Sequence, residues 1–241
     1  MKIVVFNGSP KGGKSNTHLM VREFLAGAQS AGSETEEILL VEKNIEHCLG
    51  CFSCWNRTPG KCVIDDDMSE LLLKMAADIV VFACPLYVDN ITGIMKDFMD
   101  RMIPLADPHI KLDENGECVH PLRHDSLSKI AVISNCGFAG IEHFQVLRHL
   151  YQRIARNMHS SIVGEIYRDM GELLGRDVLL LKPVLSKYRK LLRKAGKEIV
   201  SEGAISGQTT KKLEKQLIPP ARYIKAANKY WDETLEKLHD R

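Results

Sequence analysis

An alternation of short apolar runs with longer amphipathic stretches is the feature that most limits how this chain can fold. Runs rich in β-branched residues, each followed by turn-forming residues, predict five buried strands. They lie at 2–6, 36–41, 78–84, 129–134 and 161–167. Strands that are apolar along their length and separated by helices indicate a parallel sheet covered by helices on both faces.

Amphipathic helices are expected between these strands and after the last one. Apolar residues recur at helical spacing over 16–31, 68–75, 92–102, 141–157 and 187–200, and a further helix is expected from residue 219 to the end. Residues 105–128 interrupt the alternation, and the sequence Asp113-Glu114-Asn115-Gly116 within them predicts a hairpin turn. We therefore expect one α/β domain over 1–205, which contains the insertion 105–128, and a helical C-terminal extension over 206–241.

Composition excludes several classes of protein. Hydrophobic residues make up 44% and charged residues 27% of the chain, which is typical of a globular protein rather than a disordered one. No apolar run approaches the ~18 residues of a membrane-spanning helix, so no membrane association is expected. The net charge of +2 gives no reason to expect a nucleic-acid partner. Because the first residues do not form a secretory signal, we expect the protein to remain in the cytoplasm.

The loop between the first strand and the first helix has the composition of a phosphate-binding loop. Residues 8–17 offer backbone N–H groups, hydroxyls and lysines at a helix N-terminus, where the helix dipole favours an anion. Gly8 to Ser15 also fits the G-x-x-x-x-G-K-[ST] loop of nucleotide triphosphatases and kinases. That alternative needs an acidic residue after an apolar strand to help hold Mg²⁺. The third and fourth strands end instead in Cys84-Pro85 and Ser134-Asn135.

Three segments together resemble the flavodoxin-like NAD(P)H-dependent FMN reductases. Gly8-Ser9-Pro10-Lys11 with Ser15-Asn16-Thr17 is similar to the phosphate loop of that family. Pro85-Leu86-Tyr87 with Asn90-Ile91-Thr92 is similar to its loop beside the flavin ring, and Lys96-Asp97-Phe98-Met99-Asp100-Arg101 to a helix signature. The resemblance covers residues 1–167 and implies a flavodoxin-like, doubly wound, five-stranded parallel sheet of order 2-1-3-4-5. In such folds the ligand lies at the carboxyl ends of the strands.

The same resemblance implies which residues bind FMN. The first loop would hold the phosphate through Ser9, Lys11, Ser15, Asn16 and Thr17. The second would line the isoalloxazine ring through Pro85, Leu86, Tyr87, Val88 and Asn90. Asn135 and Gly137, in the loop after the fourth strand, are expected to offer amides to the ring edge. Because the hydride chemistry belongs to the flavin, no side chain is assigned as a catalytic acid or base.

Four of the seven cysteines form the most specific motif of the chain, Cys48-x2-Cys51-x2-Cys54-x7-Cys62. Four such thiolates can hold a [4Fe–4S] cluster or a tetrahedral Zn²⁺, and three close cysteines plus a fourth are more typical of iron–sulfur. The spacing resembles the compact motif of iron-sulfur flavoproteins, a branch of the same family in which the cluster approaches flavin across a subunit interface. Free thiols or a redox disulfide are the alternative. Because this loop follows the second strand, we expect it at the same sheet edge as the flavin crevice.

These observations predict an FMN-dependent oxidoreductase. NAD(P)H is the expected transient co-substrate, and the cluster is expected to pass electrons between FMN and a small-molecule or protein acceptor. The resemblance implies at least a dimer, either a homodimer or a homotetramer. Two alternatives stay open: a P-loop nucleotide triphosphatase or kinase, and a non-enzymatic flavin redox carrier or sensor.

Overall fold

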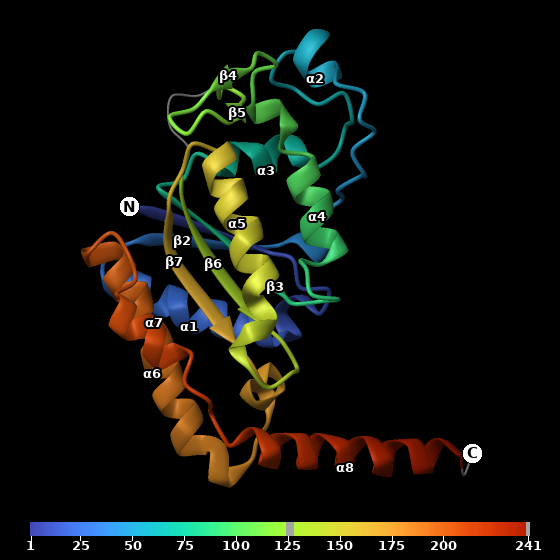
Figure 1. Cartoon of the computed structure of the whole chain (residues 1–241), viewed down its shortest axis with the longest axis vertical. Helices are drawn as coiled ribbons and strands as arrows, with labels where there is room; N and C mark the ends of the chain where they lie inside the picture. The colour runs from blue at the N-terminus through green and yellow to red at the C-terminus, as the bar shows by residue number, and fades with distance from the viewer. Residues whose placement is uncertain (124–127, 240–241) are drawn as a thin grey trace.

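A five-stranded parallel sheet forms the centre of the computed structural model, which describes residues 1–123 and 128–239 (Figure 1). Residues 124–127 of the predicted insertion therefore lie outside the described residues. The strands are ordered β2-β1-β3-β6-β7, and each pair of neighbours is parallel, which confirms the predicted order. Their bounds are β1 (Lys2–Asn7), β2 (Glu34–Leu39), β3 (Ile79–Pro85), β6 (Lys129–Asn135) and β7 (Ile162–Arg168).

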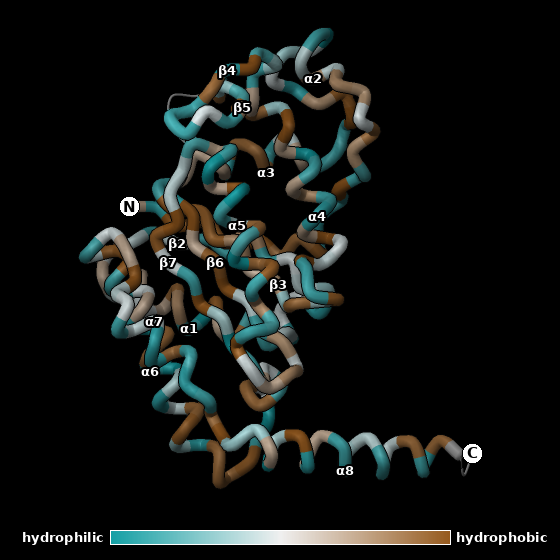
Figure 2. Tube along the Cα trace, viewed as in Figure 1, coloured by the Kyte–Doolittle hydropathy of each residue, from teal (hydrophilic) through white to brown (hydrophobic). Residues whose placement is uncertain are grey.

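The inner strands are apolar because helices cover both of their faces (Figure 2). Every residue of β3 is buried, as is every residue of β6 after the first. Phe6 and Phe82 join an apolar cluster on one face of the sheet, while Val5 and Val81 join a second cluster on the other. Since successive side chains of a strand point to opposite faces, a sheet covered on both sides leaves its inner strands no polar face.

Helices α3, α4 and α5 cover one face of the sheet, and α1, α6 and α7 cover the other. Gly27 of α1 and Gly196 of α6 lie where these two helices meet, and a Cβ atom at either position would overlap a backbone carbonyl of the other helix. Glycine is therefore what permits this close contact. The bounds are α1 (Asn16–Ser30), α3 (Met68–Lys74), α4 (Gly93–Asp100), α5 (Gln145–Asn157), α6 (Lys182–Ser201) and α7 (Gly207–Leu213).

Several elements differ from their predicted limits; helix α4, for example, ends at Asp100 rather than at residue 102. Strand β2 begins at Glu34 rather than at residue 36, because Glu34 pairs with Lys2 of β1. The strand is followed by a 3-10 helix, Leu40–Glu42. The helix expected over 141–157 is a 3-10 turn, Ile141–Phe144, followed by α5. Helix α6 begins before its predicted start, with a proline in its first turn, where the missing N–H costs no helix hydrogen bond.

Two appendages lie at opposite ends of the molecule in Figure 1. At one end the predicted hairpin is present as β4 (Lys111–Leu112) and β5 (Cys118–Val119), near the short helix α2 (Ser53–Asn56). At the other end α8 (Pro220–His239) extends away from the sheet.

The segment after residue 205 consists of α7 and α8, in line with the expected helical extension. The domain boundary at 205 stays a prediction. Helix α7, which follows it, contacts β7 and α6 and buries Leu213 in one of the two apolar clusters. No helix among the described residues is both long enough and apolar enough to cross a membrane.

Candidate functional site

The carboxyl ends of the strands carry a cavity of about 150 Å³ that gathers loops from distant parts of the sequence. Cys136 and Glu172 form part of its lining. The rest of the lining consists of ten of the twelve residues predicted to bind the cofactor: Ser9, Lys11, Ser15, Asn16, Thr17, Pro85, Leu86, Tyr87, Asn135 and Gly137. Loops following β1, β3, β6 and β7 therefore meet at one point, which is where doubly wound folds bind ligands.

The loop after β1 is held in a tight turn by its own polar groups. The backbone N–H of Ser9 donates to the side-chain oxygen of Asn7 (3.0 Å), and the N–H of Gly12 donates to the carbonyl of Ser9 (3.0 Å). Gly12 has a φ of +50°, a conformation that favours glycine. The Ser15 Oγ then accepts the N–H of His18 (3.0 Å) and so caps helix α1, as its position in the sequence predicts.

Hydroxyl groups at the start of α1 face the cavity as hydrogen-bond donors. Thr17 is buried, and its Oγ1 accepts a hydrogen bond from the side-chain amide of Asn135 (2.8 Å). Since the Ser15 and Thr17 oxygens already accept hydrogen bonds within the protein, their hydroxyl hydrogens can be donated to a ligand. Together with the positive end of the helix dipole, this arrangement suits an anionic oxygen ligand such as a phosphate.

The loop after β3 forms a tight turn with an unusual backbone. Tyr87 and Asn90 exchange two backbone hydrogen bonds of 3.0 Å, and the intervening Val88 and Asp89 have φ values of +48° and +54°. This turn leaves Val88 99% exposed, and the Asn90 side chain accepts the N–H of Ile91 (2.8 Å). Val88 and Asn90 are therefore the two predicted residues that the structure leaves outside the cavity lining. The ring of Tyr87 lies at the rim, 46% exposed.

Glu172 is the site residue that sequence reasoning missed. It belongs to a 3-10 helix, Gly171–Gly175, which follows β7. The preceding Gly171 approaches Asn135 closely, because a Cβ at Gly171 would lie 2.7 Å from the Asn135 Oδ1. The signal available in the sequence was positional: the fifth strand ends at the same sheet edge as the others, so the loop after it also faces the ligand.

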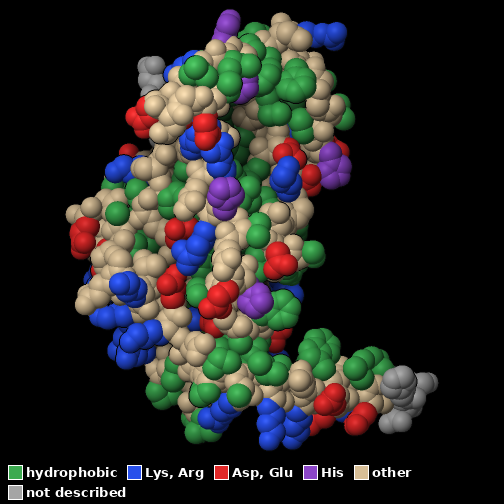
Figure 3. Space-filling model, in the orientation of Figure 1, with side chains coloured by type: hydrophobic (Ala, Val, Ile, Leu, Met, Phe, Trp, Pro, Cys, Tyr) green, Lys and Arg blue, Asp and Glu red, His purple; other side chains and the backbone are tan. Residues whose placement is uncertain are grey.

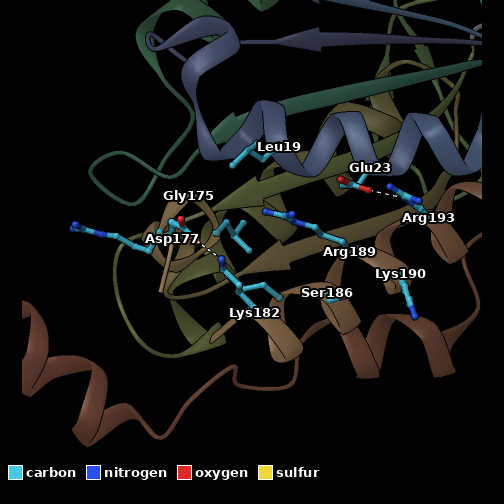
Figure 4. Close-up of a pocket in the computed structure, with 12 residues that line it drawn as sticks. Leu19, Glu23, Gly175, Asp177, Lys182, Ser186, Arg189, Lys190 and Arg193 are labelled. Atoms are coloured by element: carbon cyan, nitrogen blue, oxygen red, sulfur yellow. Dashed lines mark hydrogen bonds and ion pairs between the residues drawn. The ribbon is translucent and has the colours of Figure 1, made fainter. Parts of the chain in front are cut away.

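A larger hollow, of about 670 Å³, lies elsewhere, between α1, α6 and the turn after β7 (Figure 4). Its walls carry exposed cations, and Figure 4 shows two of their ion pairs, Arg193 with Glu23 (2.6 Å) and Lys182 with Asp177 (3.0 Å). A third cation of the lining, Arg176, pairs with Glu172 (3.9 Å). None of the twelve predicted cofactor-binding residues lines it. The smaller cavity, by contrast, is lined by ten of these twelve residues.

The four motif cysteines line one small space together with Arg101, Ile103 and Pro104. This space lies at the C-terminal end of α4, near the hairpin, whereas the N-terminal end of the same helix adjoins the phosphate loop. The expectation that the cysteines share the sheet edge of the flavin crevice is therefore wrong. The cysteines belong to the long segment between β2 and α3, which reaches the far end of α4. That helix is about 12 Å long at 1.5 Å per residue.

The cysteine site has the donors for a metal centre but is not assembled around one. Burial raises the pKa of Cys54, and the charge of Cys62 raises it further. Hydrogen bonds from Ser53 lower the pKa of the exposed Cys51. Among the described residues, no three His, Cys, Asp or Glu side chains are arranged to hold a metal ion.

The space between the cysteines is about 20 Å³, which is room for a water-sized group. The identity and number of ligands thus fit a four-thiolate centre. The space would have to widen to admit a cluster.

Comparisons with known proteins find relatives over about half of the chain. The chain is 41% identical over 106 residues to an iron-sulfur flavoprotein of Methanocaldococcus jannaschii (44% of this chain, 53% of that protein). It is 39% identical over 121 residues to one of Archaeoglobus fulgidus (49% and 54%). The chain thus spans about half the length of these relatives.

Similar folds occur among solved structures. An FMN-dependent NADH-azoreductase from Bacillus anthracis in complex with FMN superimposes with a TM-score of 0.59 at 21% identity, covering 83% of this chain and 99% of that one. An NAD(P)H:quinone oxidoreductase from Methanothermobacter marburgensis gives the same TM-score at 15% identity, covering 83% and 96%. At these identities the likeness concerns the fold.

A family model described as NADPH-dependent FMN reductase matches residues 1–165, the region that carries β1 to β6, most of β7 and the loops of the cavity after β1, β3 and β6. The match decides against the nucleotide triphosphatase alternative, which shares only the glycine-rich loop with this chain. The chain belongs to the NADPH-dependent FMN reductase family.

Proposed function

We propose that this protein is an FMN-dependent oxidoreductase that takes electrons from NAD(P)H and passes them on through a cluster bound by its four motif cysteines. One observation carries the flavin half of the proposal: hydroxyl, amide and lysine side chains from the loops after β1, β3 and β6 converge on one cavity at the carboxyl edge of the sheet. The cluster half is supported by the shared lining of the cysteine site and by relatives named iron-sulfur flavoproteins.

The phosphate of FMN would bind in the loop after β1. Ser15 and Thr17 would donate hydroxyl hydrogens, Lys11 would supply a positive charge, and Ser9 and Asn16 would complete the polar shell. A hydrogen bond to a charged group contributes about 1.5–3 kcal/mol. Two or three such bonds therefore suffice to anchor the cofactor at this end.

The isoalloxazine ring would lie at the open rim, beside Leu86 and Tyr87. Tyr87 presents an exposed aromatic face there, suited to packing on a planar ring. When bound, FMN accepts a hydride from a reduced nicotinamide and releases electrons singly. The role of the protein side chains is to hold the ring and leave one face open, and Glu172 contributes a negative charge near the rim.

We propose that electrons pass between the flavin of one copy of the chain and the cluster of another. The two sites lie at opposite ends of α4, so a flavin and a cluster from different copies can come closer than those of one chain. Helix α8 supports this assembly, because it extends from the body and carries hydrophobic side chains on its surface (Figure 3). Trp231, Leu235 and Leu238 are each more than half exposed. We propose a homodimer or homotetramer in which α8 contacts a neighbouring copy.

Absorption spectra and NADPH oxidation of protein purified without oxygen test the proposal. We expect flavin bands, a broad additional iron–sulfur absorbance, and NADPH oxidation in the presence of an acceptor such as a quinone. A colourless protein with affinity for ATP would contradict it. Flavin binding without NADH or NADPH turnover would favour the second candidate, a redox carrier or sensor. The exposed thiols Cys48 and Cys51 favour this candidate, because an oxidant can reach them.

The cysteine site is tested separately with Cys54→Ser and a matched control. Cys54 is buried in the site, whereas Cys118 lies exposed in the hairpin. Cys54→Ser should lose the iron and the broad absorbance while retaining FMN, and Cys118→Ser should retain both. Equal iron content in both variants and in the unmodified protein would exclude the motif as the cluster ligands.

A further inference from the structure

Arg101 is a fully buried cation at the end of α4, the last residue of the helix signature. Its side chain is 1% exposed. The two terminal nitrogens of the guanidinium donate to both carboxylate oxygens of Asp66 (2.6 and 2.9 Å), and one of them also donates to the carbonyl oxygen of Glu46 (2.7 Å). These bonds fasten the segment between β2 and α3 to the end of α4.

The Nε is the one nitrogen of this side chain that takes no part in the bonds to Asp66 and Glu46. The Nε of Arg101 is buried and has no hydrogen-bond partner among the described residues. An unpaired buried donor costs about 1–3 kcal/mol, and more for a charged group, so such groups call for an explanation. The two terminal nitrogens make all the hydrogen bonds to Asp66 and Glu46. These bonds do not explain why the Nε is buried without a partner among the described residues.

The unpaired donor belongs to a side chain that lines the cysteine site. Arg101 borders the same small space as Cys48, Cys51, Cys54 and Cys62. Sulfur ligands of iron–sulfur clusters accept N–H hydrogen bonds, and these bonds help to set the reduction potential.

We propose that Arg101 is a positioning residue of the cysteine site, whose Nε–H donates a hydrogen bond to a sulfur of the cluster bound there. The inference rests on the cluster assigned under the proposed function. Because Asp66 compensates the guanidinium charge, the directed N–H bond is the main contribution. The reduced cluster carries one more negative charge than the oxidised one, so the bond favours the reduced state and raises the potential.

Arg101→Lys isolates this contribution, because lysine keeps the positive charge next to Asp66 but lacks the Nε–H donor. Iron and sulfide per chain are measured first, and the midpoint potential of the cluster is then titrated by electron paramagnetic resonance. We expect a loaded variant with a more negative cluster potential and an unchanged flavin potential. A loaded variant with the potential of the unmodified protein would overturn the inference.

A second measurement is made on the unmodified protein and therefore does not depend on whether Arg101→Lys folds. The unmodified protein is produced with arginine labelled with ¹⁵N at Nε, and the reduced cluster is examined for a ¹⁵N hyperfine coupling. A coupling that persists in Arg57→Lys, the variant of the other arginine near the motif cysteines, and disappears wherever Arg101→Lys loads supports the bond. Its absence from the loaded, labelled protein overturns it. If the unmodified protein takes up no iron, the iron assay identifies that as failure of the proposed cluster, and this inference falls with it.

Discussion

The hydroxyl of Thr92 donates a hydrogen bond of 2.7 Å to the carbonyl oxygen of Gly8, across a separation of 84 residues. The same Oγ1 accepts the backbone N–H of Met95 (3.3 Å) and caps helix α4. One buried hydroxyl therefore ties the phosphate loop to the helix that follows the flavin loop. Gly8 permits this contact, because a Cβ there would lie 2.8 Å from the Cβ of Met95.

Removing the Thr92 hydroxyl should weaken both the fold and FMN binding. Thr92→Val deletes the cap, which costs about 0.5–2 kcal/mol, and leaves the Gly8 carbonyl without its partner. We expect a lower free energy of unfolding in urea and weaker FMN binding, measured by quenching of flavin fluorescence. Thr92→Ser keeps the hydroxyl and should bind FMN almost as well as the unmodified protein. Equal affinities for the valine and serine variants would refute the role of this bond.

Thr17 offers a direct test of the phosphate contact. Thr17→Val keeps the shape of the buried side chain but removes the hydroxyl that accepts from Asn135 and would donate to FMN. Loss of one hydrogen bond to a charged group, about 1.5–3 kcal/mol, should weaken FMN binding by roughly tenfold or more. Thr17→Ser is the matched control and should bind nearly normally. An unchanged dissociation constant for the valine variant would place the phosphate elsewhere.

Gly171 should be essential for the position of Asn135. In Gly171→Ala, the new methyl group would lie 2.7 Å from the Asn135 Oδ1 and 2.9 Å from its Cβ, so the asparagine has to shift away from Thr17. We expect FMN affinity to fall with a stability loss of about 1–3 kcal/mol, the usual range for overpacking. Gly93→Ala, where a methyl group meets nothing within 4 Å, is the control. Similar affinities for these two variants would contradict the argument.

The contact between α1 and α6 depends on Gly196. A methyl group there would overlap the backbone carbonyl of Phe24 and lie 2.8 Å from the backbone N of Ala28, neither of which can rotate away. Gly196→Ala should therefore lower the free energy of unfolding by at least about 3 kcal/mol, at the upper end of overpacking effects. Gly207→Ala has open space around the added methyl and should change it by less than about 0.5 kcal/mol. Urea denaturation of both variants is the measurement, and equal midpoints would be the contrary result.

Glu198 should make part of the stability depend on pH. Burial by itself raises the pKa of Glu198, but hydrogen bonds from Thr209 and Ser206 lower it more, so the net direction is below the ordinary value. A lowered pKa in the folded state adds stability at pH values above the unfolded pKa of about 4.3, and this stability is lost as the pH falls through the folded value.

Glu198→Gln removes that contribution. The variant should be less stable than the unmodified protein at pH 7, by about 1–3 kcal/mol, and the difference should shrink as the pH falls below about 4.3. Urea denaturation at several pH values between 7 and 3 provides the comparison. A difference that stays constant over this range would show that Glu198 acts by packing alone.

Much of the flavin site follows from local features of the sequence. Ser15 can be identified as the helix cap because a serine precedes the first apolar residues of a helical pattern. Residues 8–17 and 85–87 lie at a common edge because parallel strands end on the same side of a sheet. Glu172 escaped prediction because its loop carries no motif, and Val88 faces away because two successive residues with positive φ turn the loop outward.

The order of strands and helices, the phosphate loop and the cysteine spacing are properties of the sequence itself, since periodicity, turn chemistry and ligand spacing act over a few residues. The tertiary structure alone decided where the long segment between β2 and α3 goes. Arg101, Asp66 and the Glu46 carbonyl bind that segment to the far end of α4, so the cysteines lie away from the flavin cavity. Such long-range hydrogen bonds cannot be predicted from sequence periodicity, because their energy depends on which groups the folded chain buries together.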